Sequence, residues 1–238
     1  MHRFYLPNLQ HLVLSAEEAH HAIHVLRLKV GDTVNVFDGR GHEAQARIAE
    51  TTRDSVSVTI LQHSNTAPLP CRTTLAQAIP KKSMDLIVQK ATELGVVSIV
   101  PLVSERSVVK LDEDSRRMDR WREIALEACK QCGNNWLPDI QPPQKARDFL
   151  DSPGRFDLKL IASLQPDSKP LKAILGEAAK PSSLLILIGP EGDFTPAELG
   201  LAKSAGCLPL SLGPLVLRAD TAAIYTLSIL HHELQSSV

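Results

Sequence analysis

The sequence has few cysteines and no long apolar run, and both shortages narrow the class of protein. The four cysteines form no dense framework, which favours reduced thiols in a cytosolic protein over a disulfide-stapled one. The longest uninterrupted apolar run, residues 184–188, is far too short to cross a bilayer, and no signal-peptide pattern is present. We therefore expect a cytoplasmic protein with no membrane partner.

Excess charge and the commonest catalytic signatures are missing as well. The formal net charge is −1, so no global positive field steers the chain to a polyanion, and any nucleic acid must meet a local patch. No GxSxG, Walker A or HExxH string occurs. With 238 residues, 43% of them hydrophobic, the chain is long enough for one large or two ordinary globular domains.

Two motifs that resemble familiar sites favour ordinary interpretations. Residues 39–44 match GxGxxA, but the pattern that follows is β-like and no helix begins there, which favours a hairpin turn over a dinucleotide site. Cys129 and Cys132 form a CxxC inside a helical pattern without a second pair nearby. We interpret them as ordinary helix positions.

Histidines concentrate in the N-terminal part, which holds seven of the nine. His20 and His24 share a helix face, but Glu17 is the one carboxylate at helical spacing from both. A solvated or RNA-facing surface is favoured over a metal site, and no metal is predicted.

The order of patterns predicts two domains, residues 1–68 and 71–238. In the first, short β patterns surround one helix that Ser15 and Glu18 open as a capping box, which suggests a small barrel. The proline-containing segment 65–70 is the candidate linker. The strands of the first domain are expected at residues 2–6, 33–37, 42–50 and 55–61.

After the linker, strands alternate with helices, which predicts an α/β domain with a mainly parallel sheet. The apolar run 184–188 is typical of a parallel strand covered on both faces. Thr195 and Glu198 form a second capping box around Pro196, and Gly206 ends that helix. Helices are expected at residues 83–95, 114–132, 168 onward, 195–206 and 219–234, and further strands at 96–100, 158–162 and 207–212.

Two glycine-containing loops follow the strands expected at residues 184–188 and 207–212. One lies within LIGPEGDFTPAEL, residues 187–199, and the other within LGPLVLRADTAAIY, residues 212–225. Glycine lets a backbone close around a ligand because it has no Cβ and accepts positive φ. Two such loops at successive strand ends predict one pocket built largely from main chain.

The first loop is a poor phosphate cradle, because it holds Glu191 and Asp193 and no basic residue. A purely structural turn remains an alternative. An acidic loop suits a ligand with a ribose to hydrogen-bond and a positive charge, a description that fits S-adenosylmethionine. The second loop offers backbone amides and apolar walls that can read and hold an adenine.

Five segments, in order along nearly the whole chain, carry a family resemblance. They are HHAIHVLRLKVGD (20–32), KKSMDLIVQKATELGVVSIVPLVSERSVVK (81–110), WREIALEACKQC (121–132), LIGPEGDFTPAE (187–198) and LGPLVLRADTA (212–222). Together they resemble the bacterial 16S rRNA uridine N3-methyltransferases of the RsmE type, within the SPOUT class. Any one segment alone would be weak.

The resemblance implies a PUA-like barrel followed by an α/β domain that threads a trefoil knot, a topology that physical priors would reject. It also implies S-adenosylmethionine as cofactor, a homodimer, and 3-methyluridine in small-subunit rRNA as product. The cofactor-binding residues expected from the two loops are Ile188, Gly189, Pro190, Glu191, Gly192, Leu212, Gly213, Leu215, Leu217 and Thr221.

Arg218 and Asp220 are the candidate catalytic residues. Uridine N3 becomes a good nucleophile only after it loses its proton, and an arginine aimed at a flanking carbonyl oxygen would favour the anion. Arg218 lies just beyond the cofactor loop, although a salt bridge to Asp220 or Glu191 is an equal alternative. Asp220 is a candidate proton acceptor.

RNA contact is expected from basic residues within or near the matched segments, although each could be a plain solvated charge. The candidates are the basic residues Arg3, Arg27, Lys29, Lys81, Lys82 and Arg106, together with the uncharged Asn134. The chain departs from the family pattern at Asn134 and Trp136, where family members usually have basic residues. It also departs at Asp220, where family members have an acid that is one methylene longer. Stacking on Trp136 could replace a lost contact.

Two other functions stay open from sequence. The chain could be an RNA-binding assembly factor that has lost methyl transfer, although the intact loops argue against this. It could also be a related methyltransferase acting on a ribose 2′-hydroxyl or on tRNA. Sequence does not fix whether free rRNA or the assembled subunit is the substrate.

Overall fold

The computed structural model describes residues 1–107, 115–177 and 180–235, and these divide into two compact units. Unit 1 contains Met1–Pro68 together with Leu126–Leu137, and unit 2 contains Leu69–Ala125 with Pro138–Val238. The break at Pro68 falls in the expected linker. The sequence placed residues 126–137 in the second domain, whereas the structure groups them with the first.

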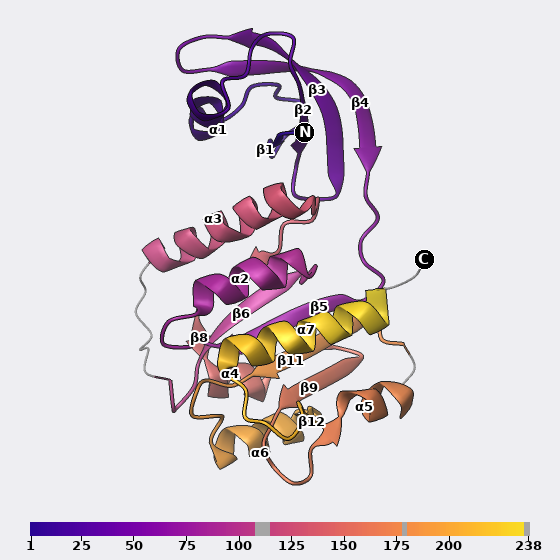
Figure 1. Cartoon of the computed structure of the whole chain (residues 1–238). Coiled ribbons are helices and arrows are strands. Elements are labelled where there is room, and N and C mark those ends of the chain that lie inside the picture. The colour runs from indigo at the N-terminus through magenta and orange to yellow at the C-terminus, as the bar shows by residue number, and fades with distance from the viewer. Residues whose placement is uncertain (108–114, 178–179, 236–238) are drawn as a thin grey trace. The chain divides into compact units, whose positions relative to one another are not determined.

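Unit 1 is built on a four-stranded sheet in the order β1-β2-β3-β4 (Figure 1). The first pair is parallel and the other two pairs are antiparallel. The strands are β1 (Arg3–Tyr5), β2 (Thr33–Phe37), β3 (His42–Thr51) and β4 (Val56–Asn65). Because β2 and β3 form an antiparallel hairpin, residues 39–41 make a turn, and the hairpin interpretation of the GxGxxA match is confirmed.

The single helix expected in unit 1 is divided into α1 (Ala16–His20) and a π-helical turn, η1 (His21–Val25). The Ser15 Oγ accepts a hydrogen bond from the Glu18 N–H at 3.2 Å, so the N-cap is confirmed. The Glu18 carboxylate instead accepts from the Tyr5 N–H and pairs with Lys130. The pair with Lys130 helps to explain why residues 126–137 group with unit 1.

Unit 2 contains the α/β fold with a parallel sheet that the sequence predicted, with strand order β10-β12-β9-β11-β5-β6-β7. Every pair in it is parallel, and β8 pairs with β6 off this path. The strands are β5 (Arg72–Ala78), β6 (Ser98–Val103), β7 (Asp139–Ile140), β8 (Gln144–Lys145), β9 (Leu158–Ala162), β10 (Lys169–Pro170), β11 (Ser183–Ile188) and β12 (Leu208–Ser211).

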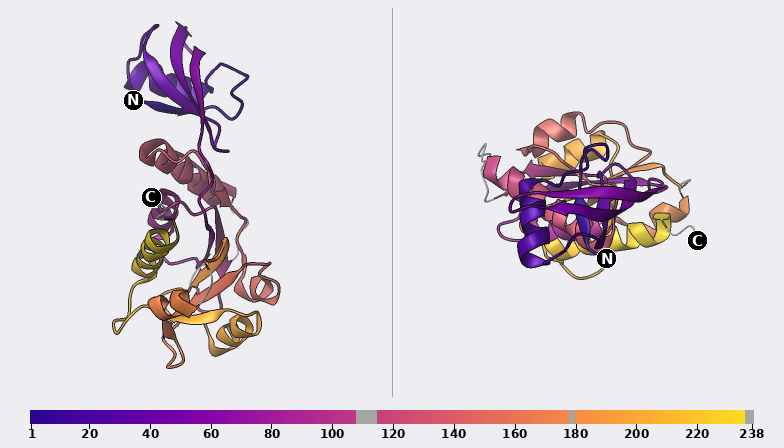
Figure 2. Two further views of the ribbon diagram at one scale, coloured as in Figure 1. Left: turned by 90° about the vertical axis from the view of Figure 1, so that its right-hand side faces the viewer. Right: turned by 90° about the horizontal axis from the view of Figure 1, so that it is seen from above.

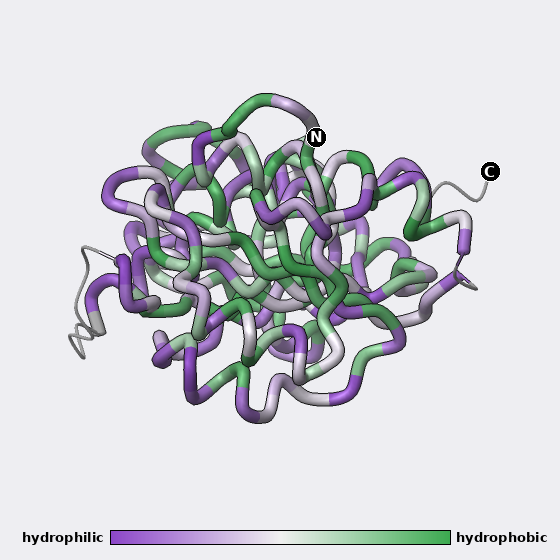
Figure 3. The backbone as a smooth tube through the Cα atoms, turned by 90° about the horizontal axis from the view of Figure 1, so that it is seen from below, coloured by the Kyte–Doolittle hydropathy of each residue, from purple (hydrophilic) through white to green (hydrophobic). Residues whose placement is uncertain are grey.

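Helices cover both faces of this sheet, as Figure 2 shows, and in Figure 3 the hydrophobic stretches of the chain gather in the middle of the view. Helices α2 and α7 pack together, as do α4 and α6. All side chains of β11 from Leu184 to Ile188 are at most 1% exposed, as expected for a strand covered on both faces. The helices are α2 (Met84–Glu93), α3 (Ser115–Cys132), α4 (Ala146–Asp151), α5 (Leu171–Glu177), α6 (Pro196–Ser204) and α7 (Ala219–Gln235).

The second capping box is confirmed at the start of α6. The Thr195 Oγ1 accepts from the Glu198 N–H at 3.3 Å, and the Glu198 carboxylate accepts from the Thr195 N–H at 2.8 Å. Both bonds satisfy donors that a helix N-terminus leaves free. They fix where the loop after β11 ends. Within the described ranges, no helix is long and apolar enough to span a membrane.

Candidate cofactor-binding and active site

Three loops meet at one edge of the unit 2 sheet. They are residues 163–168 after β9, 189–195 after β11 and 212–218 after β12. The strand order β12-β9-β11 makes these strands neighbours, so their carboxyl ends lie together. Ligands of parallel α/β sheets bind outside the carboxyl ends of the strands.

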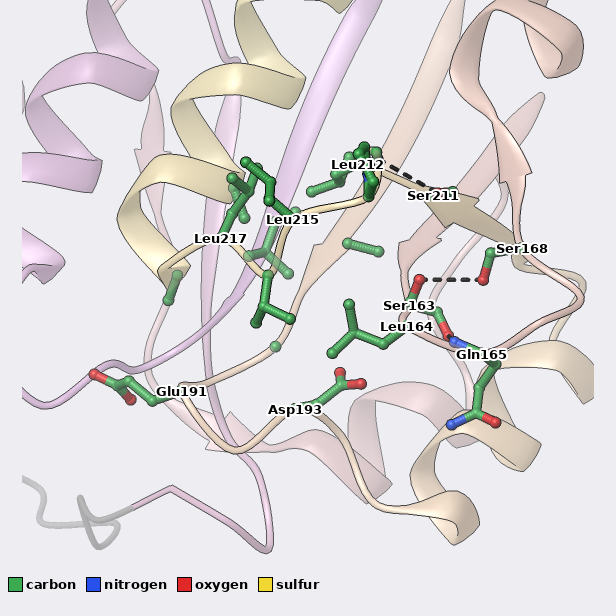
Figure 4. Close-up of a pocket in the computed structure, with 18 of the residues that line it drawn as sticks. Ser163, Leu164, Gln165, Ser168, Glu191, Asp193, Ser211, Leu212, Leu215 and Leu217 are labelled. Carbon is green, nitrogen blue, oxygen red and sulfur yellow. Dashed lines mark hydrogen bonds between the residues drawn. The ribbon is translucent and has the colours of Figure 1, made fainter.

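Residues from these loops line a pocket of about 500 Å³ (Figure 4). That volume falls within the usual range for small-molecule sites, about 300–1,000 Å³. The lining residues are Ala162, Ser163, Leu164, Gln165, Pro166, Ser168, Ile188, Gly189, Pro190, Glu191, Asp193, Ser211, Leu212, Gly213, Pro214, Leu215, Val216, Leu217, Ala219 and Ala222.

The first loop is a tight turn. The Asp193 N–H donates to the Pro190 carbonyl at 3.0 Å, and the Asp193 carboxylate accepts from the Phe194 N–H at 2.8 Å. A Cβ on Gly189 would lie 3.1 Å from the Asp193 Oδ1 and 3.3 Å from the Phe194 nitrogen, which is closer than most side chains tolerate. A side chain at 189 would therefore require the Asp193 carboxylate or the Phe194 backbone to shift.

Neighbouring strand ends brace this loop from outside the pocket. The Lys81 N–H, after β5, donates to the Glu191 carboxylate at 3.1 Å. The Arg106 guanidinium, after β6, donates to the Gly192 carbonyl at 2.7 Å. Two of the residues expected to contact RNA thus have contacts with the candidate cofactor loop.

The second loop supplies apolar walls and an unusual backbone. Gly213 has φ +107, a conformation that residues with a Cβ rarely adopt. Leu215 and Val216 are 73% and 77% exposed, so this loop presents large apolar side chains to a ligand or partner. Such exposure is typical of a binding surface.

The third loop was missed by the sequence interpretation. Ser163 and Ser168 tie it together, because the Ser168 hydroxyl donates to the Ser163 carbonyl at 3.1 Å, and Leu164 is 61% exposed beside them. Residues 158–162 were expected to form a strand, but residues 163–168 contain no glycine, so this loop lacked the feature that marked the other two. Asp193 was also left out of the expected set.

Most of the expected cofactor residues lie at this pocket. Gly192 and Thr221 do not line it. The Thr221 N–H instead donates to the Asp220 carboxylate at 2.8 Å. The expected residues that do line the pocket are Ile188, Gly189, Pro190, Glu191, Leu212, Gly213, Leu215 and Leu217.

Arg218 and Asp220 lie where the second loop enters α7. The Arg218 side chain is 80% exposed, and its Nε lies 3.8 Å from the Asp220 Oδ1. The Asp220 side chain is 16% exposed, but an ion pair this long with an exposed guanidinium contributes little stability. The guanidinium is therefore held only weakly by this partner.

The remaining candidate RNA contacts differ in their surroundings. Arg3 pairs with Glu43, donates to the Asn135 side chain at 2.7 Å and is 12% exposed. Most of its side chain is therefore engaged in contacts within unit 1. The Asn134 side chain accepts from the Trp136 N–H at 2.9 Å. The exposed candidates are Arg27, Lys29, Lys81, Lys82 and Arg106.

The Cys129–Cys132 pair lies in α3, as expected for helix positions. Burial raises the pKa of the Cys129 thiol to about 12, which opposes a reactive thiolate. Within the part of the chain that the structure describes, no group of three or more histidines, cysteines or carboxylates is placed to hold a metal ion.

A parallel sheet with a pocket at the carboxyl ends of its strands is the arrangement of many cofactor-binding α/β enzymes, and this chain also contains a second, smaller unit. Residues 67–231 match the model of an RNA methyltransferase domain, and residues 14–61 match that of an RNA methyltransferase PUA domain. The chain is therefore an RNA methyltransferase. More narrowly, it belongs to the family of ribosomal RNA small subunit methyltransferase E.

Relatives and solved structures agree with this assignment. The ribosomal RNA small subunit methyltransferase E of Bacillus subtilis is 33% identical over 228 residues, which cover 92% of this chain and 89% of that protein. A Legionella pneumophila methyltransferase solved with bound S-adenosylmethionine is 36% identical, with a TM-score of 0.88 over 97% of this chain and 96% of that one. The ribosomal RNA small subunit methyltransferase E of Neisseria gonorrhoeae, also solved with S-adenosylmethionine, is 32% identical. Its TM-score is 0.87 over 98% of this chain and 97% of that one.

Proposed function

We propose that this protein transfers a methyl group from S-adenosylmethionine to N3 of one uridine in 16S rRNA of the small ribosomal subunit. It acts in the cytoplasm as a homodimer. The observation that carries the proposal is the pocket at the ends of β9, β11 and β12, in a chain similar to two proteins solved with this cofactor.

The residues at the pocket fit S-adenosylmethionine. Its walls include Leu215 and Leu217 for the adenine, and its backbone approaches closely because Gly189 and Gly213 carry no side chain. The acidic residues of the first loop suit the hydroxyls and positive charges of the ligand. When bound, this cofactor supplies a methyl group on a cationic sulfur, an electrophile that needs no metal.

Arg218 is proposed to promote loss of the N3 proton. Deprotonated uridine spreads its negative charge over the flanking carbonyl oxygens, and a guanidinium beside one of them stabilises that charge. Arg218 is exposed at the start of α7, directly after the pocket loop. Its present partner, Asp220, is proposed to accept the proton, and the Thr221 N–H holds one oxygen of that carboxylate.

The strand order supports a threaded chain in unit 2. Strands β9 and β10 are consecutive in the chain, yet β12 lies between them in the sheet. The connection 163–168 must cross the carboxyl end of β12, where segment 212–218 leaves the sheet. This arrangement favours the trefoil knot that the resemblance implies.

Exposed apolar side chains support the homodimer. Leu164, Leu215 and Val216 are 61%, 73% and 77% exposed and lie on two loops of the same pocket. A bound cofactor and a second subunit would remove this surface from water. For RNA, the exposed basic residues of unit 1 that remain candidates are Arg27 and Lys29.

The test uses small subunits from a strain that lacks this protein. Wild-type protein and S-adenosylmethionine should restore 3-methyluridine, measured by nucleoside mass spectrometry of the extracted rRNA. Free 16S rRNA in parallel shows which form is the substrate. A methyl group on a ribose 2′-hydroxyl, or methylation of added tRNA alone, would contradict the proposal.

The role of Arg218 is tested in the same assay. Arg218→Ala should lower turnover by about 100-fold or more, the usual effect of losing one charge-stabilising donor. Its affinity for S-adenosylmethionine, measured by calorimetry, should stay close to wild type. Arg155→Ala, a change at another exposed arginine of unit 2, is the matched control. Loss of cofactor affinity in Arg218→Ala would show that the residue is architectural.

A further inference from the structure

Asp193 lies at the pocket in a backbone conformation that side chains disfavour. Its φ is +60, and among the residues described only Arg27, at +54, is another non-glycine with positive φ. Glycine adopts this region freely, whereas aspartate adopts it at a cost in stability. A strained residue in a binding pocket indicates a use for its side chain.

The Asp193 carboxylate points into the pocket. Figure 4 shows it directed toward Leu164, whereas Glu191 of the same loop points away. The Phe194 N–H holds the Oδ1 at 2.8 Å, and Phe194 is itself 1% exposed. A buried aromatic residue and a backbone bond thus fix the direction of this carboxylate.

The pocket wall offers this carboxylate no cation. Among the described residues that line it, none is lysine or arginine. The other polar side chains there are serine hydroxyls, the Gln165 amide and the Glu191 carboxylate, and much of the remaining wall is aliphatic. The carboxylate therefore presents negative charge and hydrogen-bond acceptors to whatever fills the pocket.

We infer that the Asp193 carboxylate accepts a hydrogen bond from the bound cofactor, from either the ribose hydroxyls or the α-ammonium group. Both are donors that a carboxylate binds strongly. Asp193 is then a residue that sets cofactor affinity, and its backbone conformation aims that side chain. The inference rests on the proposal that this pocket takes S-adenosylmethionine.

The test compares Asp193→Asn and Asp193→Gly by calorimetry with S-adenosylmethionine. Asparagine keeps the shape and tolerates the same φ but loses the charge. Glycine removes the side chain and suits the backbone. Both should weaken binding by about 10- to 100-fold, the usual effect of losing a hydrogen bond to a charged group. Glu177→Gln, at an exposed carboxylate of α5, is the charge-matched control and should bind as wild type.

Thermal unfolding without ligand separates a binding effect from misfolding. The unfolding midpoint of Asp193→Gly should lie no more than about 2 °C below that of the wild type. Glycine removes the cost of the positive φ, and this gain offsets the lost hydrogen bond with the Phe194 N–H. Arg27→Gly relieves a similar conformation in unit 1 and should leave cofactor affinity unchanged. Weak binding by a stable Asp193→Gly variant supports the inference.

Two further ligands identify the donor group. S-adenosylhomocysteine keeps both donors but lacks the sulfonium, so Asp193→Asn should weaken it as much as S-adenosylmethionine. 5′-Methylthioadenosine keeps the ribose and lacks the α-ammonium, so weakened binding assigns the ribose and unchanged binding assigns the ammonium. The inference is overturned if the Asp193 variants bind S-adenosylmethionine and S-adenosylhomocysteine as the wild type does. It is also overturned if they lose affinity for S-adenosylmethionine alone. Failure of the wild type to bind would instead overturn the proposed function.

Discussion

A substitution at Gly213 tests whether the pocket depends on the backbone conformation of its second loop, without disturbing side-chain packing. A Cβ added there meets no heavy atom within 4 Å, so Gly213→Ala creates no clash. The φ of +107 is strained for any side chain and costs roughly 1–3 kcal/mol. Either the folded state loses that stability, or residues 212–217 relax and the pocket changes shape.

Gly200→Ala is the matched control because it adds the same methyl group in open space. Gly200 lies in α6, has no positive φ, and a Cβ there also meets nothing within 4 Å. Alanine in a helix interior should stabilise the protein by about 0.5–1 kcal/mol. The two substitutions should therefore have effects of opposite sign.

The assay is urea unfolding with calorimetry of S-adenosylmethionine binding. In Gly213→Ala, the losses of unfolding free energy and of binding free energy should together reach about 1–3 kcal/mol. If all of it falls on binding, the Kd rises roughly 5- to 150-fold. If Gly213→Ala matches the wild type in both stability and affinity, the left-handed backbone at this position is not required, and the reasoning fails.

Three further predictions concern residues around the loops and in the core. Thr195→Ala removes the α6 cap and should lower the free energy of unfolding by about 1 kcal/mol in urea, whereas Thr195→Ser should not. Arg106→Ala removes the hydrogen bond to the Gly192 carbonyl and should raise the Kd for S-adenosylmethionine, measured by calorimetry. An unchanged Kd would show that this hydrogen bond is not needed for cofactor binding. Burial raises the pKa of the Cys129 thiol from 9.0 to about 12, so its contribution to stability is present below pH 9 and is lost as the pH rises toward 12. Between pH 9 and 12 the free energy of unfolding of Cys129→Ala should fall by about 1.4 kcal/mol per pH unit less than that of the wild type. The same pH dependence in both proteins would contradict the raised pKa of this thiol.

Local chemistry made much of unit 2 predictable from sequence. The run 184–188 predicted a strand covered on both faces, and it lies near the middle of the parallel sheet. Thr195 and Glu198 predicted a capping box that the structure contains. These features depend on residues close together in the chain, so the pattern itself carries the information.

Features that depend on strand order were not predictable in the same way. Nothing local shows that β12 lies next to β9, so the contribution of residues 163–168 to the pocket was missed. Arg3 was expected to contact RNA, but it pairs with Glu43, which lies 40 residues away on β3. Grouping of residues 126–137 with unit 1 likewise depends on distant partners, such as Glu18 for Lys130.

The central claim is that main-chain loops at the ends of β9, β11 and β12 hold S-adenosylmethionine. A crystal structure of this protein grown with the cofactor tests it directly. The account predicts electron density for the adenosyl group between residues 188–193 and 212–217, with backbone groups of the second loop at hydrogen-bond distance from the adenine. Cofactor density elsewhere, or a pocket filled by the protein's own side chains while the cofactor is bound, would contradict it.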